Sequence, residues 1–415
     1  MSRVVVRALD RVADASLFMC GLRPMFFAAT LYAAFALAWW TGFLAFGLPL
    51  PAVPGGPAVW HAHESMFGFA MAGVAGFALT AIPEFTKTAP FGPRVALMFA
   101  SLWLAGRLGF LVSGAIGALP AALANIGFPT LLVAVLAPRL LADPDRRHSG
   151  FLWAIAALAL TVAGFYVDVF GGRYPMRWLH AAIGAMMSLI IVAMSRVSMR
   201  IVNDALDATR RSGTDVVVEY VARRPRRNLA IIAIIAHTVS ELHAPQAATT
   251  GWLGLATAAA LFDLQNDWHV GRALFTRWAA MLYSVYWLMA LGYAALGAAV
   301  LVTGVPPGSG RHLLTAGAMG MSVFTVMCIA GRVHAGYPLD TRRWVSIAAS
   351  LIGVAAVLRA LSPLAGDTAL GLLVASGTCW VAAFGLAGVR LGSPWLSPRI
   401  DGRRGCEEAR TEVAR

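Results

Sequence analysis

The sequence predicts an all-α polytopic membrane protein with about twelve transmembrane helices. Hydrophobic residues make up 59% of its 415 positions, and charged residues make up only 13%. Soluble proteins carry about 25% charged residues, so this composition argues against a soluble class. Long apolar runs, separated by prolines, glycines and charge clusters, have the length of helices that cross a bilayer.

Twelve candidate spans follow one another along the chain, since a helix needs about 20 apolar residues to cross the hydrocarbon core. They occupy 25–48, 60–82, 94–113, 118–138, 150–170, 178–197, 229–243, 249–265, 278–303, 312–331, 344–362 and 368–389. The seventh and eighth are short. The whole chain, 1–415, is expected to form one transmembrane domain with a basic loop at 198–228 and a basic tail at 391–415.

Arginine and lysine predict the orientation. The N-terminus, the even-numbered loops and the C-terminal tail hold 28 of the 33 basic residues, whereas the odd-numbered loops hold Arg173, Arg177 and Arg311. The positive-inside rule then places both termini in the cytoplasm, and we expect a bacterial inner membrane protein. The net charge of +13 follows from topology, so it indicates contact with anionic lipid and no nucleic-acid partner.

Six of the nine histidines fall near the outer ends of their helices in this topology. They are His61, His63, His180, His237, His243 and His312. A single histidine at a helix end usually lies among lipid headgroups and binds nothing. Six at one depth are better explained by a haem or copper site, although His243 taken alone, followed by Ala-Pro, is better explained as a simple loop residue.

Three further charged residues belong to this prediction. Glu64 lies three residues after His61 on the same helix face and could orient that imidazole. Arg107 and Arg359 lie inside spans, where they could pair with a carboxylate such as Asp168 or hold haem propionates.

The helices also suggest an internal repeat. Helices 2, 6 and 10 each open with a histidine, and the sequence Gly-Ala-Met recurs at 184–186 and 317–319 with a second methionine eight residues later. This pattern predicts three four-helix units, as in the haem–copper oxidase bundle, although glycine, alanine and methionine are also ordinary membrane residues.

Several motifs resemble the NnrS family, whose members are bacterial membrane proteins that contain haem and copper and are associated with nitric oxide. The runs WHAHESMFGFA at 60–70 and HLLTAGAMG at 312–320 are the most specific, and LRPMFF at 22–27, LWLAGR at 102–107 and HAGYPL at 334–339 add to them. The resemblance covers the whole chain in order. The chain departs from the family pattern at Ile329 and Tyr337, where the family usually carries arginine.

The resemblance implies a protein of nitric oxide response or protection that binds a b-type haem, and copper as a further cofactor. In this hypothesis His61 or His63 and His312 ligate haem iron. His180, His237 and His243 are the candidate copper ligands. The implied partners are a diatomic gas such as nitric oxide, membrane lipid and a respiratory electron-transfer protein.

Two alternatives use the same histidines. One is a secondary transporter, and the other is a factor that delivers haem or metal to another protein. The sequence does not decide whether the protein is an enzyme.

Overall fold

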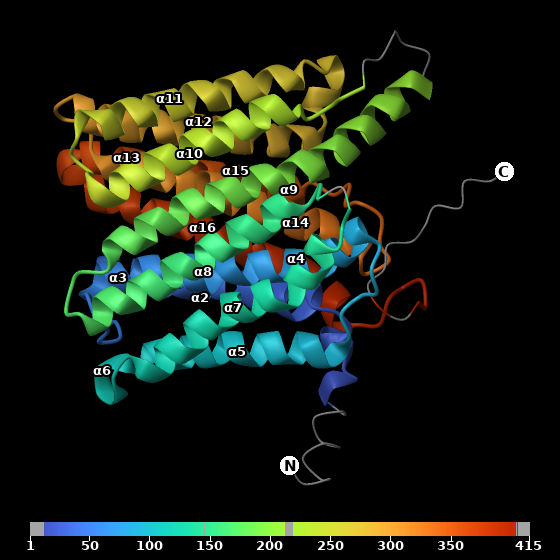
Figure 1. The fold of residues 1–415 in the computed structure, drawn as a ribbon, viewed down its shortest axis with the longest axis horizontal. Helices are drawn as coiled ribbons and strands as arrows, with labels where there is room; N and C mark the ends of the chain where they lie inside the picture. Colours follow the sequence, from blue (N-terminus) through green and yellow to red (C-terminus); the bar gives the residue numbers. More distant parts are fainter. Residues whose placement is uncertain (1–11, 145, 212–218, 404, 406–415) are drawn as a thin grey trace.

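Helices account for all regular secondary structure in the part of the chain that the computed structural model describes, which is residues 12–144, 146–211, 219–403 and 405. The helices are α2 (Leu22–Phe46), α3 (Gly56–His63), α4 (Met71–Thr86), α5 (Pro93–Leu111), α6 (Ser113–Ile116), α7 (Leu119–Leu141), α8 (Ser149–Phe170), α9 (Met176–Arg211), α10 (Arg224–His243), α11 (Ala248–Leu264), α12 (Arg277–Leu301), α13 (Pro307–His312), α14 (Gly320–Val333), α15 (Trp344–Leu361) and α16 (Ala369–Leu396). They form one elongated bundle whose long helices run in a common direction (Figure 1).

Ten helical segments within the described residues are long and apolar enough to cross a membrane, which confirms a polytopic membrane protein. The seventh and eighth predicted spans correspond to α10 and α11, which are not among the ten. Three arginines, Arg224, Arg226 and Arg227, occupy the first turn of α10, and α11 has only 17 residues. Both nevertheless run alongside the long helices (Figure 1), so the count of twelve stays a prediction.

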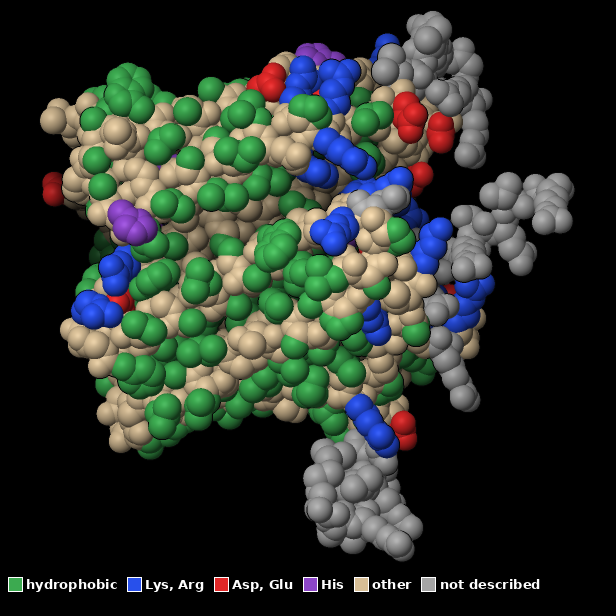
Figure 2. Space-filling model, viewed as in Figure 1, with side chains coloured by type: hydrophobic (Ala, Val, Ile, Leu, Met, Phe, Trp, Pro, Cys, Tyr) green, Lys and Arg blue, Asp and Glu red, His purple; other side chains and the backbone are tan. Residues whose placement is uncertain are grey.

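The two described ends of the chain lie at the same end of the bundle. The first long helix, α2, packs against the last one, α16, which also packs against α15. Most lysine and arginine side chains in this view gather at the same end, which we call the arginine-rich end, and hydrophobic side chains cover the middle (Figure 2). The opposite end carries the loops that precede α3, α9 and α13.

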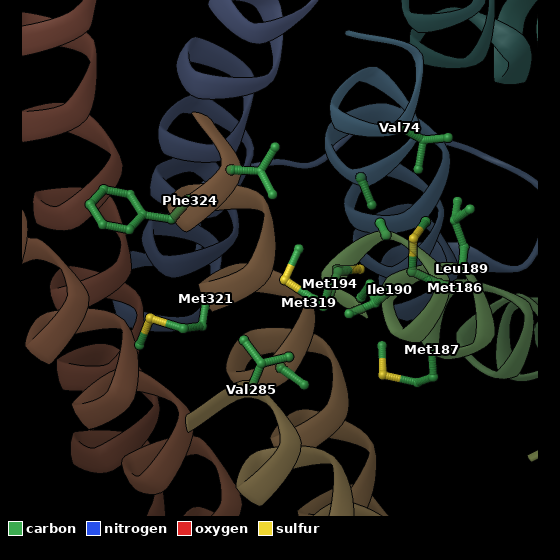
Figure 3. Packing of buried hydrophobic residues seen from close by; sticks show 14 of the residues in the cluster. Val74, Met186, Met187, Leu189, Ile190, Met194, Val285, Met319, Met321 and Phe324 are labelled. Atoms are coloured by element: carbon green, nitrogen blue, oxygen red, sulfur yellow. The ribbon is translucent and has the colours of Figure 1, made fainter. Parts of the chain in front are cut away.

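Methionines fill much of the packed centre. Figure 3 shows Met186, Met187 and Met194 of α9 near Met319 and Met321 of the tenth predicted span, and all five are buried. Methionine is flexible and polarisable, so it fills the irregular space between helices that cross at different angles. At another contact glycine is required. A Cβ atom on Gly254 of α11 would lie 2.8 Å from the Cα atom of Gly297 in α12.

The second and tenth predicted spans share an unusual backbone. In each, a short α-helix with a proline in its first turn passes into a seven-residue π-helix and then into a longer α-helix. The π-helices are η2 (Glu64–Ala70) and η5 (Leu313–Met319). The sixth span, α9, is α-helical throughout. Helices 2 and 10 thus share this backbone feature and helix 6 lacks it, while the predicted repeat of three four-helix units stays a prediction.

Candidate functional site

Three of the predicted histidines line one cavity at the end opposite the arginine-rich end. This histidine cavity has a volume of about 290 Å³ and lies among α2, α3, α9, α13, α15 and α16. Its lining includes His61, His180, His312, Arg311, Arg359, Trp40, Phe69, Gly377 and Trp380. Imidazoles from helices 2, 6 and 10 therefore meet at one depth of the bundle.

The two π-helices shape this cavity in the same way. A π-helix is rare, occurs as a short interruption of an α-helix, and is frequently found at functional sites. Each of the two presents residues at positions i, i+1 and i+4 to the cavity. These are Ser65, Met66 and Phe69 in η2, and Thr315, Ala316 and Met319 in η5. The π-helix that follows His61 or His312 thus adds small and apolar side chains to the same cavity lining.

His312 is held in one tautomer. Its Nδ1 atom lies 2.7 Å from the carbonyl oxygen of Gly308, one turn earlier, and a carbonyl can only accept. The proton therefore sits on Nδ1, and the Nε2 lone pair remains available for a ligand. A backbone or carboxylate acceptor on the far nitrogen is the usual arrangement of a metal-binding histidine.

His61 faces the same space from the second span. Its ring stacks on Trp40, with centroids 4.5 Å apart and planes inclined by 11°, and neither ring nitrogen has a hydrogen-bond partner among the described residues. Arg359 is close enough to His61 and His312 to act on both electrostatically, and it donates a hydrogen bond to Ser362 at 3.0 Å. Two guanidiniums and three imidazoles, counting Arg311 and His180, thus share an otherwise largely apolar cavity.

His63 points away from this cavity. Its Nδ1 donates to Glu64 at 2.7 Å, and its Nε2 lies 3.1 Å from the hydroxyl of Tyr166. The ring also stacks on Phe110 with centroids 3.6 Å apart. Both nitrogens of His63 are occupied by protein hydrogen bonds, so of the two alternatives for helix 2 it is His61 that has a free nitrogen beside His312.

Arg107 belongs to the same buried network. It donates to Glu64 at 2.8 Å and to Asn125, and the side chains of the ion pair are only 5% and 2% exposed. Tyr32 donates to the other carboxylate oxygen of Glu64. Glu64 orients His63 rather than His61, and Arg107 lies outside the lining of the histidine cavity.

The suggested pairing of Arg107 or Arg359 with Asp168 is wrong. Asp168 accepts hydrogen bonds from Arg173 at 2.7 Å and from Arg177 at 2.6 and 2.7 Å. Both arginines follow Asp168 by less than ten residues, across the turn between α8 and α9. The partners of Asp168 thus come from the short connection that directly follows it. Arg107 and Arg359 have other partners, Glu64 and Ser362.

His180 and His237 flank a second cavity. This cavity has a volume of about 510 Å³ and is lined by both histidines together with Glu241, Arg177 and Arg311. His180 and Arg311 line both cavities, so they form part of the wall between them. The ring of His237 meets Tyr293 edge to face at 5.3 Å.

His243 lines neither cavity. It ends α10 on the surface, and its Nδ1 donates to the carbonyl of Val239 at 2.9 Å. Within residues 12–144, 146–211 and 219–403, no three histidine, cysteine, aspartate or glutamate side chains lie close enough together to hold a metal ion. Of the six predicted histidines, three line the histidine cavity and two line the second cavity, with His180 shared by both. His63 belongs to the buried network around Glu64, and His243 lies on the surface.

Sequence reasoning missed the partners of the buried charges. Tyr32, Asn125 and Tyr166 each lie within an apolar span, where an isolated polar residue gives no indication of what it contacts. Arg311 was counted only as a loop arginine, but it donates to Glu241 at 2.8 Å across 70 residues of sequence. A carboxylate in the last turn of α10, with no lysine or arginine nearby in sequence, was the signal available for that pair.

The comparisons with known proteins agree with the fold. The family model described as NnrS protein matches residues 16–399, nearly the whole chain. No curated protein matches the chain.

Proposed function

Because the chain belongs to the NnrS family, we propose that it is a haem-binding membrane protein whose iron takes nitric oxide as a ligand in nitric oxide response or protection. In this proposal the haem occupies the histidine cavity, held by His312 and His61. The excess of arginine at the other end supports an orientation with both termini in the cytoplasm of a bacterium and the cavity near the periplasmic face of the inner membrane.

The single observation that carries the proposal is the state of His312. Its Nδ1–H is bound to Gly308, and its Nε2 is free at a cavity that a second unpaired imidazole, His61, also lines. Neutral imidazole with a fixed far nitrogen is the common protein ligand of haem iron.

The remaining lining fits a haem in chemistry. Arg359 supplies a guanidinium suited to a propionate carboxylate, and Phe69 and Trp380 supply apolar wall. The cavity volume of about 290 Å³ lies just below the range for ligand pockets, about 300 to 1,000 Å³. A bound haem would provide an iron centre able to take a diatomic gas, while the protein orients the imidazoles and keeps water away from them.

Copper stays a prediction from the resemblance. His180 and His237 line the second cavity, but Arg311 already neutralises the carboxylate of Glu241 in the same lining, and no set of three ligands forms within the described residues. The transporter alternative is less well supported, since transporters bind substrate near the bilayer midplane. The two cavities that the predicted histidines line both lie towards one end.

Optical spectra of the purified protein test the proposal. Wild type produced with ample haem should show a Soret band, and His61→Ala and His312→Ala should each shift or weaken it. His243→Ala, which removes a surface imidazole from the same end, is the matched control and should keep the wild-type spectrum. A haem-free wild type would refute the proposal.

A further inference from the structure

The second cavity has the chemistry of an anion site. It lies among α9, α10, α11, α12 and α13, at the same end as the histidine cavity, and shares Met176, His180 and Arg311 with it. Its lining contains one acidic residue, Glu241, and two basic ones, Arg177 and Arg311. It is also the more polar and larger of the two, with a volume of about 510 Å³.

Arg311 has hydrogen-bonding capacity that the protein does not use. One terminal nitrogen, Nη2, donates to Glu241 at 2.8 Å, but the Nε–H is buried and has no acceptor among the described residues. A buried donor without an acceptor is unfavourable, and guanidinium has a fixed fork of donors that matches planar oxyanions. The unmatched donor therefore indicates a missing acceptor.

Two imidazoles beside it can add donors. His180 and His237 both line the cavity, and neither makes a hydrogen bond within the described part of the chain. Both lie within electrostatic range of Arg311 and Glu241. Each neutral imidazole carries one N–H, so the two can donate to the same ligand as Arg311.

The charge around the cavity favours an anion over a cation. Glu241 is neutralised by Arg311. Asp168 is shared by Arg173 and Arg177, which leaves one positive charge in excess near Arg177. Such an excess at a cavity attracts anions and raises their local concentration.

We propose that the second cavity binds a small planar oxyanion of the nitrite or nitrate class, held by Arg311 and assisted by His180 and His237. This proposal rests on the proposed function in one respect, the choice of nitrogen oxyanions, which are the oxidised relatives of nitric oxide. The anion would occupy the compartment next to the histidine cavity, with His180 and Arg311 in the wall between them.

Calorimetric titration of the purified full-length protein with sodium nitrite and sodium nitrate, in haem-free and haem-loaded forms, tests the proposal. Ionic strength is kept constant with gluconate. Wild type should bind with saturation at one site in both forms. Arg311→Gln should weaken binding about tenfold or more, because it removes a charge-assisted hydrogen bond.

Arg226→Gln is the matched control. Arg226 is 25% exposed and pairs with Asp267 at 2.6 Å, much as the 22% exposed Arg311 pairs with Glu241, but it lies at the arginine-rich end. Its anion binding should equal that of wild type. Glu241→Gln should tighten binding, since it removes the carboxylate that competes for Arg311, and a merely structural role would not produce a gain.

Three results would overturn the inference: no saturable binding in wild type, equal binding in the Arg311 and Arg226 variants, or loss of binding when haem is loaded. The last would mean that Arg311 serves the haem itself. Binding to the haem-free protein is measured without reference to a Soret band, so failure of the haem proposal and failure of the anion proposal are separate outcomes.

Discussion

The buried ion pair between Glu64 and Arg107 allows a quantitative test of how the second span is held. The change Glu64→Gln keeps the shape of the side chain but removes its charge. In the native protein the carboxylate accepts from Arg107, His63 and Tyr32, and it is only 2% exposed. An amide offers one acceptor oxygen, and its NH₂ group would face a donor.

Removing one partner of a buried ion pair leaves an uncompensated charge, and this costs about 3–5 kcal/mol. We therefore expect Glu64→Gln to lower the free energy of unfolding by about that amount, measured by titration with SDS in mixed micelles. The control is Asp204→Asn, whose pair with Arg200 is 3.9 Å long and 60% and 69% exposed. That variant should change stability by about 0.5 kcal/mol or less.

A double-mutant cycle separates the ion pair from the rest of the network. Arg107→Met should be destabilising by itself, and in combination with Glu64→Gln the loss should be smaller than the sum, because the two variants remove the same interaction. If Glu64→Gln costs less than about 1 kcal/mol, or if the two losses simply add, the network does not stabilise the second span as we describe.

Two further predictions concern packing and pH. Gly254→Val should destabilise the protein and separate α11 from α12, because a Cβ there would lie 2.8 Å from the Cα of Gly297. Thermal unfolding, followed by size-exclusion chromatography, should show a lower midpoint. An unchanged midpoint would contradict the close contact. At the arginine-rich end, hydrogen bonds from Arg342 hold the pKa of Asp340 well below its usual range. The stability that this carboxylate contributes is present above its pKa in the unfolded chain, about 4, and is lost as the pH falls through its pKa in the folded protein. Unfolding midpoints should therefore stay level from about pH 7 to 5 and fall below about pH 4. Asp340→Asn should reduce this acid-dependent loss, and an equally steep acid decline in that variant would assign it to other groups, such as Asp168 and Asp401.

Much of the fold is encoded in local properties of the chain, which explains why it could be predicted. Apolar run length and the placement of arginines require no knowledge of tertiary contacts, and they locate the long helices and the arginine-rich end. The π-helices could not be predicted, because the same residues read as ordinary α-helix and only packing around η2 and η5 selects the wider turn. The length of α10 is sufficient for a membrane span, but Arg224, Arg226 and Arg227 add charge to its first turn.

The candidate site could be predicted where it depends on how deep each histidine lies along its membrane helix. Depth along the helices brought His61, His180 and His312 to the same end, and the structure places all three around one cavity. The depth of a residue along a helix does not tell on which face of the helix its side chain lies. His61 and His63 are two residues apart on one helix, so they face different surroundings, and only the structure shows that His63 is hydrogen-bonded to Glu64 and Tyr166.

The central claim is that the free nitrogen of His312 holds a haem in the histidine cavity, and chemical rescue tests it most directly. The measurement is the Soret band of His312→Gly, purified with ample haem, before and after addition of free imidazole. We predict a weakened or shifted band that imidazole restores, since the ligand would re-enter the space left by the side chain. A His312→Gly protein with the wild-type spectrum and no response to imidazole would contradict the claim.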